Sequence, residues 1–249
     1  MSLSTNYLKS KDKILATIID GSVDEDIFII NNTKESKNSK KQSDNQRKEI
    51  AIKVYEALLS SIISQQISVM AANSIKAKIK ALYGGDFPNV DVLILENIES
   101  LRLAGLSLQK AQYMKNVAEY FSVVVDLDFI NMSDEEIINT LTQIKGVGRW
   151  TVEMMLMFTL GRKDVFAIKD GGLISGVTKL YNLEKYSLNS SKKIKYLANK
   201  DSKENKDNTE IMKAKDFEKK ILEITSKWSP YRSIASLYLW KYKDSQKKL

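Results

Sequence analysis

The 249-residue sequence contains no cysteine, no histidine and only two prolines. Without cysteine the chain has no disulfide, no thiol nucleophile and no thiolate ligands for an iron–sulfur cluster. Without histidine it has neither imidazole acid–base chemistry nor histidine-ligated zinc. Any acid–base chemistry must therefore come from carboxylates.

Long apolar runs are also missing. We see no signal peptide and no segment of membrane-spanning length, so we expect a cytoplasmic protein without membrane association. Basic residues outnumber acidic ones, with 39 Lys and Arg against 31 Asp and Glu. The net charge is therefore +8, and the pI is near 9.3. This balance suits a polyanionic partner, although a lysine-rich proteome gives similar values.

Apolar residues recur at helical spacing through most of the chain, so we expect an all-helical protein. A length of 249 residues allows one large domain or two small ones. The clearest apolar stripe follows Glu49 and consists of Val54, Tyr55, Leu58, Leu59, Ile62 and Ile63. These residues are predicted to form the core.

Two polar stretches interrupt the helical pattern. The first is residues 31–47, whose composition predicts a loop. This loop belongs to a polar N-terminal extension, residues 1–48. The extension is also expected to contain a short helix over 12–19 and a strand or buried turn over 27–30. Residues 187–215 are polar and lysine-rich and predict an inserted surface loop. The main domain is expected to span residues 49–249.

A capping box and two glycines predict a pair of helices joined by a hairpin. Ser133 as N-cap with Glu136 three residues later starts the first helix. Gly146 and Gly148 give the turn backbone freedom, and apolar periodicity resumes until Gly161. Such a backbone can approach a phosphate closely, and the amides at the start of the second helix attract an anion. A tight turn between packed helices is the alternative.

Residues 144–176, IKGVGRWTVEMMLMFTLGRKDVFAIKDGGLISG, resemble the hairpin and Gly/Pro/Asp region of the helix-hairpin-helix DNA glycosylases, and most of all the 3-methyladenine DNA glycosylase II branch. Three more segments are similar to that family: 58–79, 105–121 and 228–240. The resemblance covers roughly residues 49–186 and 216–241. It implies an all-α fold in which helical subdomains flank a DNA-binding cleft, between the helices of 49–121 and 133–172. Ala167 and Lys169 depart from the family's usual proline and acidic residue.

The resemblance implies a role for each residue that matches a family motif. Asp170 falls on the catalytic carboxylate, and Gln66 falls on the position that fills the gap left by a flipped base, within a loop of Gln65, Gln66 and Ile67. The phosphate-binding hairpin would comprise Lys145, Gly146, Val147, Gly148, Arg149 and Thr151. The base pocket would comprise Trp150, Met154, Gly171 and Trp240. A monovalent cation is implied at the carbonyls of Gln143, Lys145 and Gly148, and no other cofactor.

Structural roles remain open for several of these residues. Asp170 could cap a helix starting at Gly172, and the amides of Gln65 and Gln66 could cap helices. Core packing is the usual fate of tryptophan in a helical bundle, and it competes with the base pocket for Trp150 and Trp240.

Local patterns give further expectations outside these motifs. Ser229 is predicted to cap a helix whose first residue is Pro230. Lys110 and Lys115 are expected on exposed faces of their helix, contacting either phosphate or solvent. Glu153 is a second candidate carboxylate, with a favourable interaction with the helix dipole as its simpler role.

The expected function is that of a monomeric DNA repair glycosylase acting on double-stranded DNA. It would flip an alkylated, cationic purine such as 3-methyladenine out of the duplex and hydrolyse its N-glycosidic bond, without a strong general acid. One alternative is a glycosylase/lyase with a Schiff-base lysine, whose usual place is held here by Trp150, with Lys145 and Lys169 nearby. Another is a non-catalytic helix-hairpin-helix DNA-binding protein.

Overall fold

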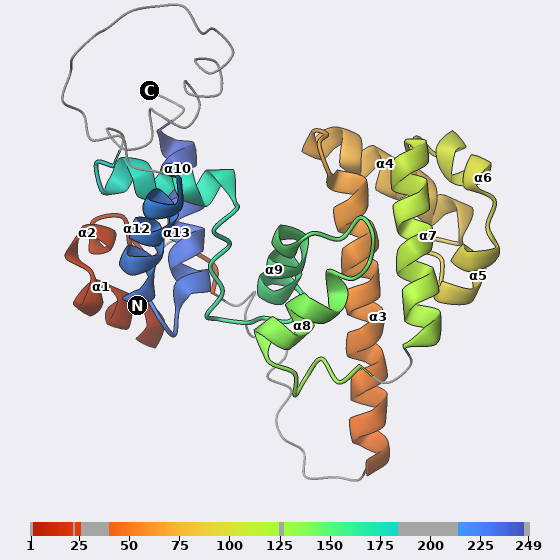
Figure 1. The fold of residues 1–249 in the computed structure, drawn as a ribbon, viewed down its shortest axis with the longest axis horizontal. Helices are drawn as coiled ribbons and strands as arrows, with labels where there is room; N and C mark the ends of the chain where they lie inside the picture. Colours follow the sequence, from red (N-terminus) through yellow and green to blue (C-terminus); the bar gives the residue numbers. More distant parts are fainter. Residues whose placement is uncertain (1, 22, 26–39, 125–126, 184–213, 247–249) are drawn as a thin grey trace, which may run out of the picture. The chain divides into compact units, whose positions relative to one another are not determined.

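The computed structural model describes the whole chain except residues 1, 22, 26–39, 125–126, 184–213 and 247–249 (Figure 1). The described residues form helices joined by turns, with no strand among them, so the predicted all-α class is confirmed. No helix in this part of the chain is both long and apolar enough to span a membrane. The expected strand or turn at 27–30 and nearly all of the expected insertion at 187–215 lie outside the described residues.

The chain folds as two compact units. The central unit is Phe28–Gly161, and the terminal unit combines Met1–Ile27 with Arg162–Leu249. Contacts therefore join the first residues of the chain to its C-terminal part.

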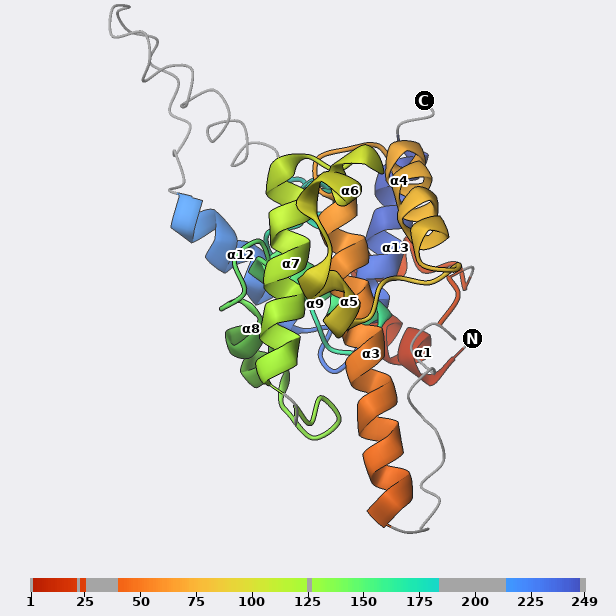
Figure 2. The ribbon, with the colours of Figure 1, turned by 90° about the vertical axis from the view of Figure 1, so that its right-hand side faces the viewer.

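The long helix α3 organises the central unit and packs against α4, α7 and α9 (Figures 1 and 2). The predicted apolar stripe faces this core, where five of its side chains have no exposed surface: Val54, Leu58, Leu59, Ile62 and Ile63. The helices of the unit are α3 (Lys40–Ser64), α4 (Val69–Leu82), α5 (Val90–Leu95), α6 (Ile98–Leu103), α7 (Leu108–Val123), α8 (Asp134–Leu141) and α9 (Arg149–Phe158).

Helix α3 begins at Lys40 and not near Glu49, so the loop predicted over 31–47 is wrong in its second half. Extending a helix that is already nucleated fixes one residue for each new hydrogen bond, and polar residues such as Lys, Gln and Arg favour it. Arg47 also contacts Asp128 at 2.9 Å, which ties this polar part of α3 to the chain beyond α7.

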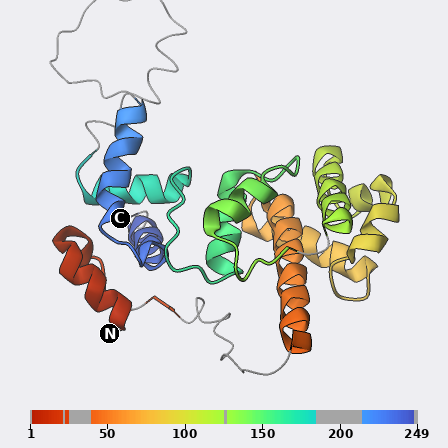
Figure 3. The same cartoon turned by 60° about the horizontal axis from the view of Figure 1, so that its bottom comes forward.

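In the terminal unit, α10 packs against α13 and α1 contacts α13 (Figures 1 and 3). Trp228 and Tyr238 are its largest buried side chains. The helices of this unit are α1 (Leu3–Lys11), α2 (Lys13–Ala16), α10 (Gly171–Leu180), α12 (Ala214–Ser226) and α13 (Arg232–Ser245).

Asp12 anchors the N-terminal segment in the terminal unit. Its Oδ1 accepts from the amides of Ile14 and Leu15, each at 3.0 Å, and so caps α2. Its Oδ2 accepts from Trp228 Nε1 at 3.0 Å and from the Tyr181 hydroxyl at 2.5 Å. The helix predicted over 12–19 is thus the shorter α2. Helix α1 could not be predicted from the sequence, because its apolar residues are few and its contacts include those with the distant α13.

The predicted start of the last helix is wrong. Helix α13 begins at Arg232, with Tyr231 at the N-cap position, so Pro230 is not its first residue. The Ser229 hydroxyl donates to Asp164 Oδ2 at 2.8 Å and does not cap the helix. Asp164 also accepts from Arg232 Nε at 2.7 Å, so a carboxylate distant in sequence holds this end of α13.

Candidate functional site

The helix-hairpin-helix predicted from the sequence is present in the central unit as α8, a turn and α9. The Ser133 hydroxyl accepts from the Glu136 amide, and the Glu136 carboxylate accepts from the Ser133 amide at 2.7 Å, so the capping box is confirmed. Gly146 has a φ of +107°, and a Cβ there would lie 2.3 Å from Cγ of Tyr113. Only glycine fits this conformation and this close approach to Tyr113.

Gly148 has a different role from Gly146. Its φ of −94° suits other residues, and it forms the N-cap position of α9 without a side-chain cap. A Cβ on Gly148 would meet no atom within 4 Å. The start of α9 therefore faces open space, where its amides are accessible to an anion.

The charge at the hairpin differs from what the sequence indicates. Arg149 contacts Glu135 Oε1 at 2.5 Å and Glu153 Oε1 at 2.9 Å, so two carboxylates offset its charge. Lys145 is exposed. Thr151 and Val147 are buried, so their side chains are not available to a ligand. The Val147 amide donates to the Ile144 carbonyl at 3.0 Å. The positive potential of the hairpin therefore comes from Lys145 and the amides of α9.

Glu153 is buried among the core residues of α9, with 3% of its surface exposed. Burial raises its pKa, while the ion pair with Arg149 opposes that rise. The hydrogen bond from Arg149 lowers the pKa of Glu135. Oε2 of Glu153 has no hydrogen-bond partner among the described residues. Glu153 thus fixes Arg149 at the base of the hairpin.

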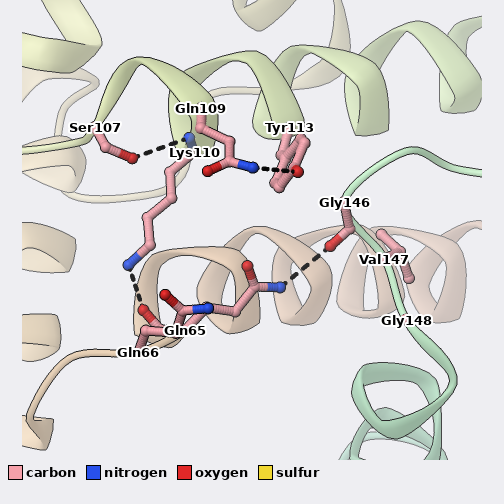
Figure 4. Close-up of a pocket in the computed structure, with 9 residues that line it drawn as sticks. All are labelled: Gln65, Gln66, Ser107, Gln109, Lys110, Tyr113, Gly146, Val147 and Gly148. Carbon is pink, nitrogen blue, oxygen red and sulfur yellow. Dashed lines mark hydrogen bonds between the residues drawn. The ribbon is translucent and has the colours of Figure 1, made fainter. Parts of the chain in front are cut away.

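The loop between α3 and α4 carries the predicted wedge residues. Gln65 Nε2 donates to the Gly146 carbonyl at 3.1 Å, so the loop is joined to the hairpin (Figure 4). Gln66 is exposed and has a φ of +58°. Ser68 caps α4 by accepting from the Ala71 amide at 3.2 Å, so neither glutamine caps that helix. Ile67, the third predicted residue, is 38% exposed.

A polar pocket of about 420 Å³ lies between this loop, the start of α7 and the hairpin (Figure 4). It brings Gln65 and Gln66 together with Gly146, Val147 and Gly148. Helix α7 and its N-cap contribute lining residues that were not predicted from the sequence: Ser107, Gln109, Lys110 and Tyr113. The spacing of Gln109 and Tyr113 on one helix face is the signal that could have indicated them.

Lys110 and Lys115 are partly buried and do not project from exposed faces as predicted. Lys110 Nζ donates to the carbonyls of Ile63 at 2.8 Å and Gln65 at 2.6 Å. Lys115 Nζ donates to the Glu96 carbonyl at 2.6 Å. Their flexible stems let both ammonium groups turn toward carbonyls at helix ends, which lack partners within their own helices.

Trp150 is 39% exposed and lines a second pocket of about 310 Å³ with Ser61, Ser64, Gln65 and Gln66. Core packing, the simpler alternative, therefore does not describe it. Met154 is half-buried one turn further along α9. Trp150 thus lines a pocket together with residues of the Gln65–Gln66 loop.

Asp170 and Trp240 meet in the terminal unit. Oδ1 of Asp170 accepts from the Leu173 amide at 2.8 Å and from Trp240 Nε1 at 3.0 Å. Asp170 is thus the N-cap of α10, which begins at Gly171 and not at Gly172. The cap predicted as an alternative is real, and it orients the carboxylate that the resemblance assigns to catalysis.

Gly172 lets Asp170 and Trp240 approach each other. A Cβ on Gly172 would lie 3.0 Å from Asp170 Oδ1 and 3.0 Å from Trp240 Nε1. Gly171 is exposed, and a Cβ there would meet no atom within 4 Å. Trp240 itself is half-buried, so it is neither a core residue nor fully open to solvent. Lys169 pairs with Glu218.

The predicted residues therefore fall into two groups. The central unit holds the hairpin, the Gln65–Gln66 loop, Trp150 and Met154, whereas the terminal unit holds Asp170, Gly171 and Trp240.

Two of the three carbonyls expected to hold a cation accept hydrogen bonds. Asn116 Nδ2 donates to the Lys145 carbonyl at 3.0 Å, and the Val152 amide donates to the Gly148 carbonyl at 3.2 Å. A carbonyl has a second lone pair, so both oxygens remain compatible with a cation.

Known proteins are similar to this chain in sequence and in fold. The chain is 36% identical over 199 residues to a DNA-3-methyladenine glycosylase of Saccharomyces cerevisiae, covering 74% of this chain and 64% of the yeast protein. The chain thus spans 64% of the length of that curated relative.

Two solved structures resemble the whole chain. A DNA-3-methyladenine glycosidase from Bacillus halodurans matches with a TM-score of 0.67 and 28% identity, covering 99% of this chain and 92% of that one. A 3-methyladenine DNA glycosylase of Schizosaccharomyces pombe, in complex with abasic DNA, matches with a TM-score of 0.64 and 27% identity, covering 100% and 98%.

The model of one protein family matches residues 59–203, which include the α3–α4 loop, the hairpin and Asp170. That match covers more than half of the chain, and the relatives above carry the same fold. The chain belongs to the HhH-GPD superfamily of base excision DNA repair proteins.

Proposed function

We propose that this protein removes alkylated purines such as 3-methyladenine from double-stranded DNA by hydrolysing the N-glycosidic bond. The observation that carries the proposal is the Asp170 carboxylate, held by the Leu173 amide and Trp240 Nε1 at the exposed start of α10. The names of the relatives support the substrate class. A DNA substrate implies that the protein acts inside the cell, and we expect it to do so as a monomer.

The chemistry requires a carboxylate near the sugar. As the bond between C1′ and the base breaks, the base takes the bonding electrons and positive charge develops on the sugar. A carboxylate fixed in advance by two donors stabilises that charge without reorganising. Water then forms a bond to C1′ and loses a proton to the solvent. A cationic purine leaves as a neutral base, so the reaction needs no histidine as general acid.

DNA binding falls to the central unit. The open amides at the start of α9 and the exposed Lys145 suit a backbone phosphate. Gln66, exposed at the tip of its loop, suits the gap left by a flipped nucleotide, and Trp150 offers an aromatic edge to a base. Base flipping costs a few kcal/mol, which these contacts offset.

We further propose a monovalent cation at the carbonyls of Gln143, Lys145 and Gly148, between hairpin and phosphate. If this is right, binding to a duplex with an abasic site is tighter in potassium chloride than in tetramethylammonium chloride of equal ionic strength. Equal affinity in the two salts would remove the cation from the account.

Incubation with methylated duplex DNA, followed by chromatography of the free bases, tests the proposed activity. We expect release of 3-methyladenine or another methylated purine and no strand cleavage. Borohydride added to the same reaction should trap no covalent adduct, since Trp150 stands at the usual lysine position and Lys169 pairs with Glu218. Damage-independent binding without base release would identify a DNA-binding protein instead.

A further inference from the structure

Lys110 extends from the first turn of α7 to the end of α3 (Figure 4). Its ammonium donates to two backbone carbonyls there, those of Ile63 at 2.8 Å and Gln65 at 2.6 Å. Carbonyls in the last turn of a helix have no partner within the helix, and a cation at that end interacts favourably with the helix dipole. Lys110 therefore fixes the backbone of the residue that precedes Gln66.

The side chain of Gln65 makes a second attachment. Its Nε2 donates to the Gly146 carbonyl of the hairpin at 3.1 Å. Gly146 is in turn held against the ring of Tyr113 on α7. Gln65 is thus fixed through its backbone by Lys110 and through its side chain by the hairpin.

Gln66 is the residue that benefits from these attachments. Its φ of +58° lies in the left-handed region, which residues other than glycine occupy only when surrounding contacts impose it. The side chain of Gln66 is exposed, whereas Lys110 and Gln65 beside it are partly buried. An exposed side chain on a rigid backbone can insert into DNA with little loss of conformational freedom.

The orientation of Lys110 argues against a phosphate contact. Burial lowers the pKa of the Lys110 ammonium, which indicates that the group is drawn away from solvent. Both short hydrogen bonds direct it toward the protein backbone and not outward. Lys145, by contrast, is exposed at the hairpin.

We infer that Lys110 is a positioning residue that, together with Gln65, holds Gln66 ready to fill the gap left by a flipped nucleotide. The inference rests on the proposed function, and it adds a role for α7 in base excision. Without Lys110, the loop loses its attachment to α7 and Gln66 samples other conformations before it can insert.

Lys110→Gln removes the ammonium and shortens the side chain. We expect single-turnover release of a methylated base from a fully paired duplex to fall about tenfold, the effect of losing about 1.4 kcal/mol. On a duplex with a gap opposite the lesion, where no pairing must be broken, the rate should stay within about twofold of the wild type. Lys110→Arg, which restores a cationic donor, should recover part of the loss.

Lys115→Gln is the matched control, because Lys115 lies on the same helix and also donates to a backbone carbonyl, that of Glu96. Both variants should lower the melting temperature, but Lys115→Gln should leave the ratio of rates on paired and gapped duplexes unchanged. A similar change of that ratio in both variants would show that reduced stability explains it, and would overturn the inference.

Salt dependence separates positioning from phosphate binding. Affinity for duplex DNA decreases with salt, and the slope of log affinity against log salt is about −0.9 for each phosphate contact. A protein that loses one such contact therefore shows a slope that is shallower by about 0.9. We expect that change for Lys145→Gln and no change for Lys110→Gln. A shallower slope for Lys110→Gln would make Lys110 a DNA-binding residue and contradict its positioning role.

A binding measurement tests the inference without relying on catalysis. The probe is a duplex with an abasic-site analogue opposite 2-aminopurine, whose fluorescence responds to insertion of a side chain at the gap. Wild type and Lys115→Gln should give the same change, and Lys110→Gln a smaller one. If this pattern holds while the wild type releases no base, the proposed function fails and the role of Lys110 stands. If the wild type releases base and Lys110→Gln matches it both in base release and in the 2-aminopurine signal, the role of Lys110 fails.

Discussion

At the scale of single residues, a glycine decides whether Asp170 and Trp240 can meet. We predict that Gly172→Ala lowers base release about tenfold or more, because its Cβ would lie 3.0 Å from both Asp170 Oδ1 and Trp240 Nε1 and must displace one of them. Single-turnover rates at saturating enzyme check this.

Trp240→Phe tests the same contact from the other side. It keeps an aromatic ring, smaller than the indole, and removes the N–H that donates to Asp170 Oδ1. We expect a similar fall in rate, with binding to abasic duplex nearly unchanged. If Trp240→Phe keeps the wild-type rate on neutral hypoxanthine and loses activity only on cationic purines, Trp240 acts through its ring as a base-stacking residue.

The sequence predicts Asp170 correctly as a helix cap but does not predict its bond to Trp240, 70 residues further along the chain. The reason is physical. A cap is a local hydrogen bond that depends on neighbouring residues, whereas the indole contact depends on how α10 packs against α13. The same holds for Lys110, since no local pattern shows that a lysine on α7 reaches the end of α3.

At the scale of the helices, Arg149 holds α9 to α8 through its carboxylate partners. We predict that Arg149→Gln lowers the free energy of unfolding at pH 7 by about 1 to 2 kcal/mol, less than for a fully buried pair because Arg149 is 46% exposed. Arg102→Gln, which breaks a surface pair with Glu99, should change it by no more than about 0.5 kcal/mol.

The effect of Arg149→Gln should depend on pH. Burial already raises the pKa of Glu153 in the folded protein, so its contribution to stability is present at low pH and lost as pH rises through the folded-state pKa. Removing Arg149 raises the pKa of Glu153 further. The stability lost when Glu153 ionises, at pH values above that pKa, is then larger. The deficit should therefore shrink between neutral pH and about pH 4, close to the ordinary range of a glutamate. A deficit that is constant with pH in urea melts would show that the ion pair is not its cause.

The existence of the hairpin could be predicted from the sequence, but its charge and the ends of other helices could not. A capping box and two glycines indicate α8, the turn and α9 locally. The close approach of Gly146 to Tyr113 of α7 is a tertiary contact that the local pattern does not show. Helix α1 and the early start of α3 were missed because polar residues carry no periodic signal. The start of α13 is held by Asp164 and not capped by Ser229, and Asp164 lies far away in the sequence.

At the scale of the whole molecule, the first residues of the chain complete the terminal unit. We predict that Asp12→Ala lowers the free energy of unfolding by about 2 to 4 kcal/mol, because it leaves the buried indole of Trp228 and the Tyr181 hydroxyl without their carboxylate. Asp20→Ala removes an exposed contact with Lys241 and should cost no more than about 1 kcal/mol. Equal losses in thermal melts would show that the N-terminal segment is not anchored through Asp12.

The central claim is that Asp170 supplies the carboxylate for base release, and Asp170→Asn tests it most directly. Asn keeps a side-chain oxygen able to accept from the Leu173 amide and Trp240 Nε1, so α10 should remain capped and the fold intact. We predict that single-turnover release of 3-methyladenine from duplex DNA falls by at least about a hundredfold, while affinity for an abasic duplex stays within about twofold. A variant that releases the base at nearly the wild-type rate would contradict the assignment of Asp170.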